Sequence, residues 1–161
     1  MNFEEVYKYK KDADSVFRMF TDKAYFERKY AETTSSFEVL EHAKDDARFQ
    51  IKVKRVMPAD VPVPGFAKKF LPGEMTVEQE DVWDIATRTG TIHIDIHGAP
   101  VTVSAKMRLI DGAEGGENHV SWTIDCNVPL VGKKVARFVA DDIQAKSPED
   151  LRLSNEILQD Y

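Results

Sequence analysis

Residues 119–146 read HVSWTIDCNVPLVGKKVARFVADDIQAK, and this stretch decides the fold. Apolar and polar residues alternate through 120–128, which is typical of a strand with one buried face. After that the period changes, and apolar residues recur at helical spacing from Leu130 onward. The stretch therefore predicts a long strand followed directly by an amphipathic helix, Leu130 to Lys146, which the rest of the sheet must cover.

The chain before this stretch carries the same strand alternation over much of its length. We expect strands at Phe3–Tyr9, at 37–53 as a hairpin that turns at residues 44–46, at Met75–Asp84, at Thr89–His97 and at Val101–Ile110. Two short helices are predicted after the first strand, one within residues 12–22 and one from Lys23 to Ala31. So regular a period of two favours an antiparallel sheet, and strands of this length must twist and curl.

Near the C-terminus, Ser147-Pro148-Glu149-Asp150 has the pattern of a new helix start. Ser147 could cap the first amides, Pro148 suits the first helical position, and Asp150 could reach back. The pattern predicts that the long helix breaks at Lys146 and that a separate terminal helix follows.

Composition limits the classes of protein to consider. The chain has 161 residues, the usual size of one domain, and we expect a single domain spanning 1–161. Its net charge of -6 argues against nucleic-acid partners. With one cysteine, Cys126, and no long apolar stretch or leader-like N-terminus, we expect a cytoplasmic monomer or simple homodimer without a membrane span.

A proline-rich connection separates the predicted hairpin from the later strands. PADVPVPGFAKKFLPG, residues 58–73, holds four of the seven prolines, and proline cannot join the middle of a hydrogen-bonded ladder. Within it, GFAKKFL can form a helical turn or two that presents Phe66, Phe70 and Leu71 together. We expect this segment, Pro58–Pro72, to act as a gate.

The order of elements resembles the START-like, or helix-grip, superfamily of lipid-transfer proteins, polyketide cyclases and birch-pollen-type allergens. More narrowly, the chain resembles an uncharacterised bacterial family of that superfamily, a domain of unknown function. The residues that carry this resemblance are Pro64-Gly65-Phe66, Leu71-Pro72-Gly73, Val77–Trp83 and Asn127–Lys133. The resemblance implies an α+β helix-grip fold, with about seven antiparallel strands curved around the long helix. It also implies a cavity between sheet and helix that often holds a hydrophobic ligand, and it carries over no catalytic residue.

Several side chains are candidates for lining such a cavity, because they lie on the inward parity of their strands or on the apolar stripe of a helix. They are Phe66, Phe70, Gln79, Asp81, Trp83, Met107, Trp122, Val135 and Phe138. The apolar members could equally pack a closed core, since periodicity does not distinguish lining from filling. Gln79 and Asp81 share the parity of Trp83, whereas the acidic run around them otherwise reads as a solvated edge.

The remaining polar motifs favour ordinary surface roles. His93, Asp95 and His97 alternate with isoleucines of the buried parity, so they should face solvent, and we predict no metal and no cofactor. The pair Lys68-Lys69 and the cluster in residues 133–137 are too short to predict recruitment to a membrane or a phosphate.

Three functions stay open from the sequence. The first is binding of a small hydrophobic ligand, a lipid or a polyketide-like molecule, in the cavity. The second is an enzyme of the cyclase/aromatase or hydrolase kind that uses Gln79 and Asp81 in the same cavity. The third is an interaction protein of the co-chaperone type with a filled core.

Overall fold

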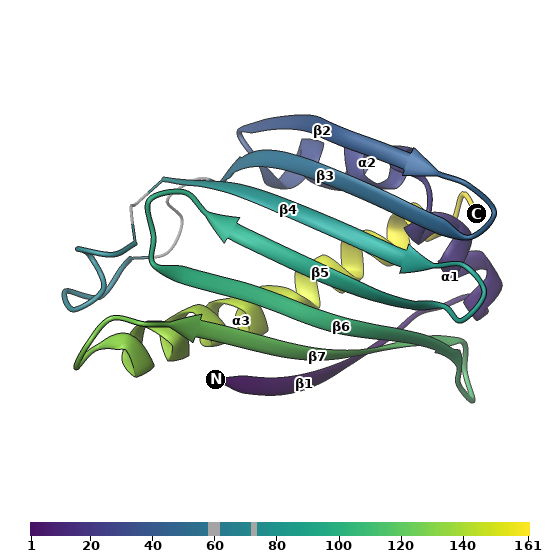
Figure 1. Ribbon diagram of the computed structural model, residues 1–161. Helices are drawn as coiled ribbons and strands as arrows, with labels where there is room; N and C mark the ends of the chain where they lie inside the picture. The colour runs from purple at the N-terminus through teal and green to yellow at the C-terminus, as the bar shows by residue number, and fades with distance from the viewer. Residues whose placement is uncertain (58–61, 72–73) are drawn as a thin grey trace.

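One antiparallel sheet dominates the computed structural model, which describes residues 1–57, 62–71 and 74–161. Within these residues seven strands lie in the order β1-β7-β6-β5-β4-β3-β2, so that the first strand pairs with the last (Figure 1). The strands are β1 (Asn2–Lys8), β2 (Ser36–Lys44), β3 (Arg48–Met57), β4 (Met75–Asp84), β5 (Thr89–Ile96), β6 (Val101–Asp111) and β7 (Gly116–Cys126). The predicted curved antiparallel sheet is confirmed.

In the part of the chain that the structure describes, three helices cover one face of this sheet (Figure 1). They are α1 (Ala13–Phe20), α2 (Lys23–Thr33) and α3 (Gly132–Leu158). Aspartates cap the two short helices, because the Asp12 carboxylate accepts from the Ser15 amide at 2.9 Å and that of Asp22 accepts from the Ala24 amide at 3.0 Å. The helix-grip arrangement predicted from the sequence is therefore present.

The predicted break in the last helix is wrong. α3 runs without interruption through Pro148 for 27 residues, about 40 Å at the usual rise. Ser147 does not cap a new helix, because its Oγ lies 2.9 Å from both the Ile143 carbonyl and the Glu5 carboxylate. Asp150 binds Lys29 at 2.7 Å instead of reaching back. Contacts with β1 and α2 thus hold the chain helical where the local sequence favours a new start.

Aromatic rings pack between α1 and the inner face of the sheet. Phe17 meets the Trp83 indole edge-on and Phe20 stacks on it, each at 5.6 Å between ring centroids. Gly90 lies opposite Trp83 across β4 and β5, and a Cβ there would lie 2.8 Å from the indole. Only glycine leaves room for that ring, so this end of the concave face is tightly packed.

The acidic run on β4 does not lie on an edge strand, because β4 pairs with β3 on one side and β5 on the other. Glu78 and Glu80 are on the outer face, where they contact His97 at 2.6 Å and Gln50 at 3.0 Å. Asp81 lies on the inner face and is buried, as the strand alternation predicts.

Candidate ligand cavity

A cavity of about 560 Å³ lies between the concave face of the sheet, α2 and α3. Its apolar wall combines side chains from α1, α2 and α3, from strands β3 to β7 and from the segment 62–71. These include Phe20, Phe26, Met57, Leu71, Met75, Val77, Trp83, Ile92, Ile94, Ile96, Val103, Met107, Val120, Trp122, Phe138, Val139 and Ile143. Exposed residues such as Glu32, Thr33 and Glu149 also border it, which places its mouth between α2 and α3. The filled-core alternative therefore does not hold.

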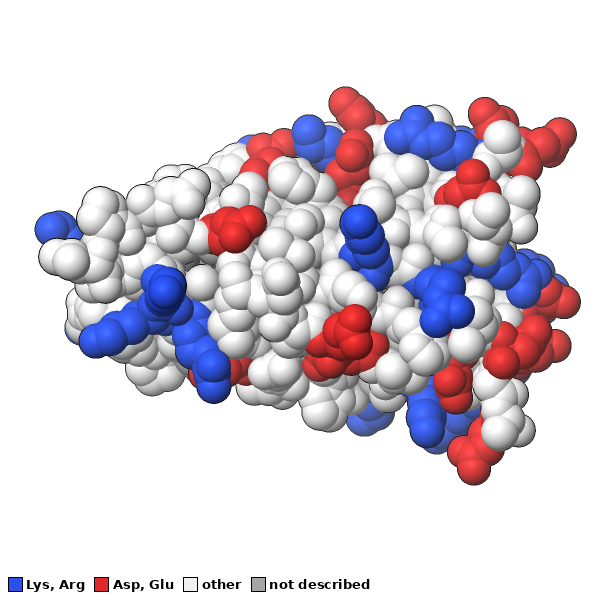
Figure 2. All heavy atoms as spheres, turned by 60° about the horizontal axis from the view of Figure 1, so that its bottom comes forward, with Lys and Arg blue, Asp and Glu red and all other residues white. Residues whose placement is uncertain are grey.

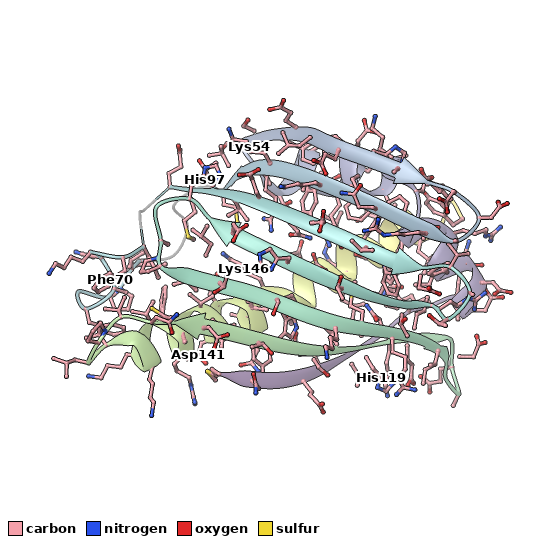
Figure 3. The ribbon with its side chains drawn as sticks, in the orientation of Figure 1. Lys54, Phe70, His97, His119, Asp141 and Lys146 are labelled. Carbon is pink, nitrogen blue, oxygen red and sulfur yellow. The ribbon has the colours of Figure 1, made fainter. Side chains whose placement is uncertain are left out.

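Most of the candidate residues meet at this cavity. Those that line it are Gln79, Asp81, Trp83, Met107, Trp122 and Phe138. Val135 is fully buried in the core behind it, and the other two candidates belong to the segment 62–71. Phe66 is 40% exposed, and Phe70 is half-buried at the end of the molecule beyond the sheet (Figure 3). Of that segment, Leu71 is the described residue that lines the cavity.

The predicted gate, Pro58–Pro72, lies partly outside the described residues. In its described part the carbonyl of Pro64 accepts from the amides of Ala67 and Lys68, at 2.9 and 3.1 Å. The Ala67 carbonyl accepts in the same way from Phe70 and Leu71. The helical turns predicted in GFAKKFL are present, whereas a gating role stays a prediction.

A row of three polar side chains enters the cavity from neighbouring strands, and we call Arg55, Gln79 and Asp81 the polar row. Arg55 Nη2 donates to Gln79 Oε1 at 2.8 Å, and Gln79 Nε2 donates to Asp81 Oδ1 at 2.7 Å. The guanidinium lies over the Tyr30 ring at 4.9 Å. Its Nε is buried and has no hydrogen-bond partner among the described residues. The row is therefore a connected network that leaves donor and acceptor capacity unused.

Burial raises the pKa of Asp81 to about 6, although the hydrogen bond from Gln79 and the charges of Lys29 and Arg55 act in the opposite direction. A carboxyl with this pKa changes charge close to neutral pH. It can accept a hydrogen bond from a ligand when ionised and donate one when protonated. Asp81 is thus the chemically most adaptable group in the wall.

An ion pair closes the wall where α2 meets α3. Lys29 Nζ lies 2.7 Å from Asp150 Oδ1. Burial opposes the charge on Lys29, but Asp150 and the neighbouring rings of Tyr25 and Tyr30 raise its pKa well above the ordinary value. Burial also raises the pKa of Tyr25 to about 12. One turn away on α3, Lys146 lies 2.9 Å from Asp142 and sits beneath the middle of the sheet (Figure 3).

A second polar network, which we call the Glu5 cluster, fixes α3 to the first strand. The Glu5 carboxylate accepts from Tyr7 Oη, from Trp122 Nε1 at 3.1 Å and from Ser147 Oγ at 2.9 Å. Tyr7, Trp122 and Ser147 all line the cavity. Burial and the adjacent Glu5 carboxylate raise the pKa of Tyr7 well above its usual value, so its hydroxyl stays protonated and donates. The cluster therefore links β1, β7 and α3 in this wall.

Sequence reasoning missed Arg55, Asn118, Lys29 and Glu5. The first two had a signal, because Arg55 continues the inward parity of Phe49, Ile51 and Val53, and Asn118 continues that of β7. Asn118 Oδ1 is a second buried atom that lacks a partner in the described chain. Nothing local marked Lys29, since its partner Asp150 lies more than a hundred residues away. The same holds for the contacts of Glu5 with Trp122 and Ser147.

The outer face of β5 carries no comparable network. His93 and Asp95 are exposed, 3.4 Å apart, and the alternating isoleucines line the cavity on the opposite face. Across residues 1–57, 62–71 and 74–161, no group of three or more His, Cys, Asp or Glu side chains is arranged to hold a metal ion. In the same residues no helix is both long and apolar enough to cross a bilayer.

A family description, "Protein of unknown function (DUF2505)", matches residues 5–156, nearly the whole chain. The chain belongs to the DUF2505 family. Among curated proteins, none matches this member of the family.

Solved structures with this fold differ widely in sequence. Ara h 8.0201 superposes with a TM-score of 0.65 at 18% identity, covering 100% of this chain and 99% of its own. The Zhui aromatase/cyclase from Streptomyces sp. R1128 gives 0.66 at 13%, covering 99% and 93%. Norcoclaurine synthase from Thalictrum flavum, in complex with dopamine and hydroxybenzaldehyde, gives 0.65 at 12%, covering 99% and 87%. At such identities the likeness shows a shared START-like fold.

Proposed function

We propose that this protein binds a small hydrophobic molecule, a lipid or a polyketide-like compound, whose apolar body fills the cavity and whose polar group meets the polar row. The observation that carries the proposal is the apolar cavity of about 560 Å³ with the polar row in its wall. Its volume falls within the roughly 300–1,000 Å³ common for small-molecule sites, and few convergent polar groups in an apolar wall are typical of them.

The cost of keeping Asp81 in this place supports the same proposal. A buried carboxyl with a raised pKa destabilises the folded chain above that pKa, and an apolar residue of similar size would not. Groups that break a folding rule in this way are concentrated at binding and catalytic sites. A ligand polar group would satisfy the unused capacity of Arg55 and Asp81.

The direct test is to look for a bound molecule. Native mass spectrometry and solvent extraction of the purified protein should reveal a co-purified hydrophobic compound, and a fluorescent fatty acid should bind with a blue shift in its emission. Absence of both would overturn the proposal.

A pair of neighbouring substitutions localises the site. Ile94→Trp places a large ring in the cavity and removes space for the ligand. It should weaken binding of the fluorescent fatty acid at least about tenfold. His93→Trp puts the same ring on the outer face of the same strand and should leave binding unchanged. Circular dichroism checks that both variants fold. Equal binding by both would place the ligand elsewhere.

A second function, an enzyme of the cyclase/aromatase or hydrolase kind, is favoured by one observation. Asp81 has a pKa of about 6 inside the cavity, close to the value suited to a general acid or base at neutral pH. Two proteins of the same fold are described as an aromatase/cyclase and a synthase. In that case Asp81→Ala and Gln79→Ala should abolish turnover of the co-purified compound while its binding persists.

A further inference from the structure

Leu130 is the most exposed large apolar side chain in the described chain. It lies in the turn between β7 and α3, is completely exposed, and has a backbone φ of 70°. This left-handed conformation disfavours a branched residue such as leucine, and an apolar side chain gains nothing from water. Neither turn geometry nor packing against residues 1–57, 62–71 and 74–161 therefore accounts for leucine at this position.

A second exposed apolar side chain lies at the same end of the molecule. Phe66, in the segment after β3, is 40% exposed, and Lys134 Nζ lies 6.0 Å from its ring centroid. That contact joins the segment 62–71 to the first turn of α3, and both project past the ends of the strands, at the left of Figure 1. We call residues 62–71 and 130–141 together the basic tip.

The tip is basic, although the chain as a whole has a net charge of -6. Its exposed cations are Lys68, Lys69, Lys133, Lys134 and Arg137. Figure 2 shows a group of Lys and Arg at this end with little red beside it, whereas Lys and Arg are mixed with most of the acidic residues over the rest of this face. The tip holds one acidic residue, Asp141, which pairs with Arg137 at 3.4 Å. In the described chain the four lysines have no carboxylate within ion-pair distance.

We propose that the basic tip docks on the surface of an anionic lipid membrane. Leu130 and Phe66 would enter the boundary between headgroups and acyl chains, while the lysines would extend to the lipid phosphates. A protein partner suits the tip less, because protein interfaces are depleted in lysine and bury a continuous apolar patch. Two separate apolar protrusions among lysines fit a fluid, negatively charged surface. The basic residues of 62–71 and those of 130–141 are each too few to predict membrane recruitment from the sequence. The fold brings the two groups together on one surface.

The tip lies next to the cavity. Leu71, at the end of the segment 62–71, and Phe138, one turn after Lys134, both line the cavity wall. Docking would therefore bring one end of the cavity to the lipid surface. The docking itself goes beyond the proposed function, because it requires no bound ligand.

Co-sedimentation of the full chain with sucrose-loaded vesicles tests the proposal. The protein should bind vesicles that contain phosphatidylserine, should bind those of phosphatidylcholine alone much more weakly, and should dissociate as salt is added. Lys133→Ala/Lys134→Ala should lower the partition coefficient about 25-fold, since each lysine near an anionic surface is worth roughly fivefold.

Leu130→Gly separates docking from stability. Glycine accepts a φ of 70° without strain, so the variant should be at least as stable as the wild type in urea. It should nevertheless bind the anionic vesicles roughly tenfold more weakly, because the inserted side chain is gone.

Lys8→Ala/Lys23→Ala is the matched control, since it removes the same charge from exposed positions outside the tip. It should bind the vesicles as the wild type does, and so should Ile94→Trp, whose cavity is blocked. The proposal fails if phosphatidylserine vesicles are not bound, or if the control loses as much binding as the tip variant. Tip-dependent self-association in sedimentation velocity would show that a second copy covers this surface, and would also overturn it.

Discussion

The Glu5 cluster and the polar row are both polar networks in the wall of one cavity, but they differ in how fully they are satisfied. Glu5 accepts from three side-chain donors. Asp81 accepts one hydrogen bond from the described chain, and Arg55 keeps a buried Nε without a partner there. A complete network stabilises the fold, whereas an incomplete one weakens it and offers groups to a ligand. The comparison separates scaffold from site within a single wall.

The largest effect is expected from breaking the complete network. Glu5→Ala leaves Trp122 Nε1 without its acceptor and removes one of the partners of Tyr7 Oη and Ser147 Oγ, and the three lost hydrogen bonds should lower the free energy of unfolding by about 3–5 kcal/mol. Urea denaturation followed by tryptophan fluorescence measures the loss.

Glu4→Ala is the matched control. Glu4 is the exposed neighbour on the same strand, and its loss should cost less than about 0.5 kcal/mol. If the two variants were equally stable, the Glu5 cluster would not hold α3 to the sheet.

An effect of opposite sign is expected at the polar row. The pKa of Asp81 is about 6 in the folded chain and about 4 when unfolded, so the folded state binds the proton more tightly. The protonated carboxyl therefore contributes to the free energy of unfolding at low pH, and this contribution is lost as pH rises from about 4 to about 6. Above pH 6 the buried carboxylate is charged and lowers the free energy of unfolding. Asp81→Asn should therefore stabilise the protein at pH 7.5 by about 1–3 kcal/mol.

This gain should disappear toward pH 4, which a series of urea titrations across that range would reveal. A gain that did not depend on pH would mean that Asp81 is not the titrating group.

The smallest effect concerns recognition by Arg55. Arg55→Met should weaken binding of a fluorescent fatty acid about tenfold, because one hydrogen bond to a charged group contributes about that much. It should weaken binding of the matching fatty alcohol less. Lys54→Met, the neighbour on the outer face of β3, should leave both affinities unchanged. Equal losses of affinity for the acid and the alcohol would show that Arg55 shapes the cavity without binding the polar group of the ligand.

Strand alternation was enough to place much of the cavity. It put Gln79, Asp81 and Trp83 on the inner face of β4 and the isoleucines of β5 opposite the histidines, because the side-chain period in a strand is fixed at two. It could not show that the wall is hollow, since the same apolar pattern suits a filled core. The space is set by how far α2 and α3 stand from the sheet.

Contacts between distant segments explain the rest. The break predicted at Ser147 follows sound local rules, but its hydroxyl finds Glu5 on the first strand and the helix continues. The pairing of Lys29 with Asp150 likewise joins two helices far apart in the chain. A pattern in a short stretch of sequence does not reveal contacts with distant residues. These contacts determine where α3 ends and which charged side chains lie in the cavity wall.

The pairing of β1 with β7 also sets an order for building the molecule. Strands β2 to β7 each pair with a neighbour in sequence and can form as successive hairpins, whereas β1 must wait for the last strand. During synthesis on the ribosome β1 is made first and stays without its partner while the meander assembles. When it joins β7, it also brings Glu5 to Ser147 of α3, so the pairing of this strand and this wall of the cavity depend on each other. The hollow interior therefore needs segments from both halves of the sequence before its wall is complete.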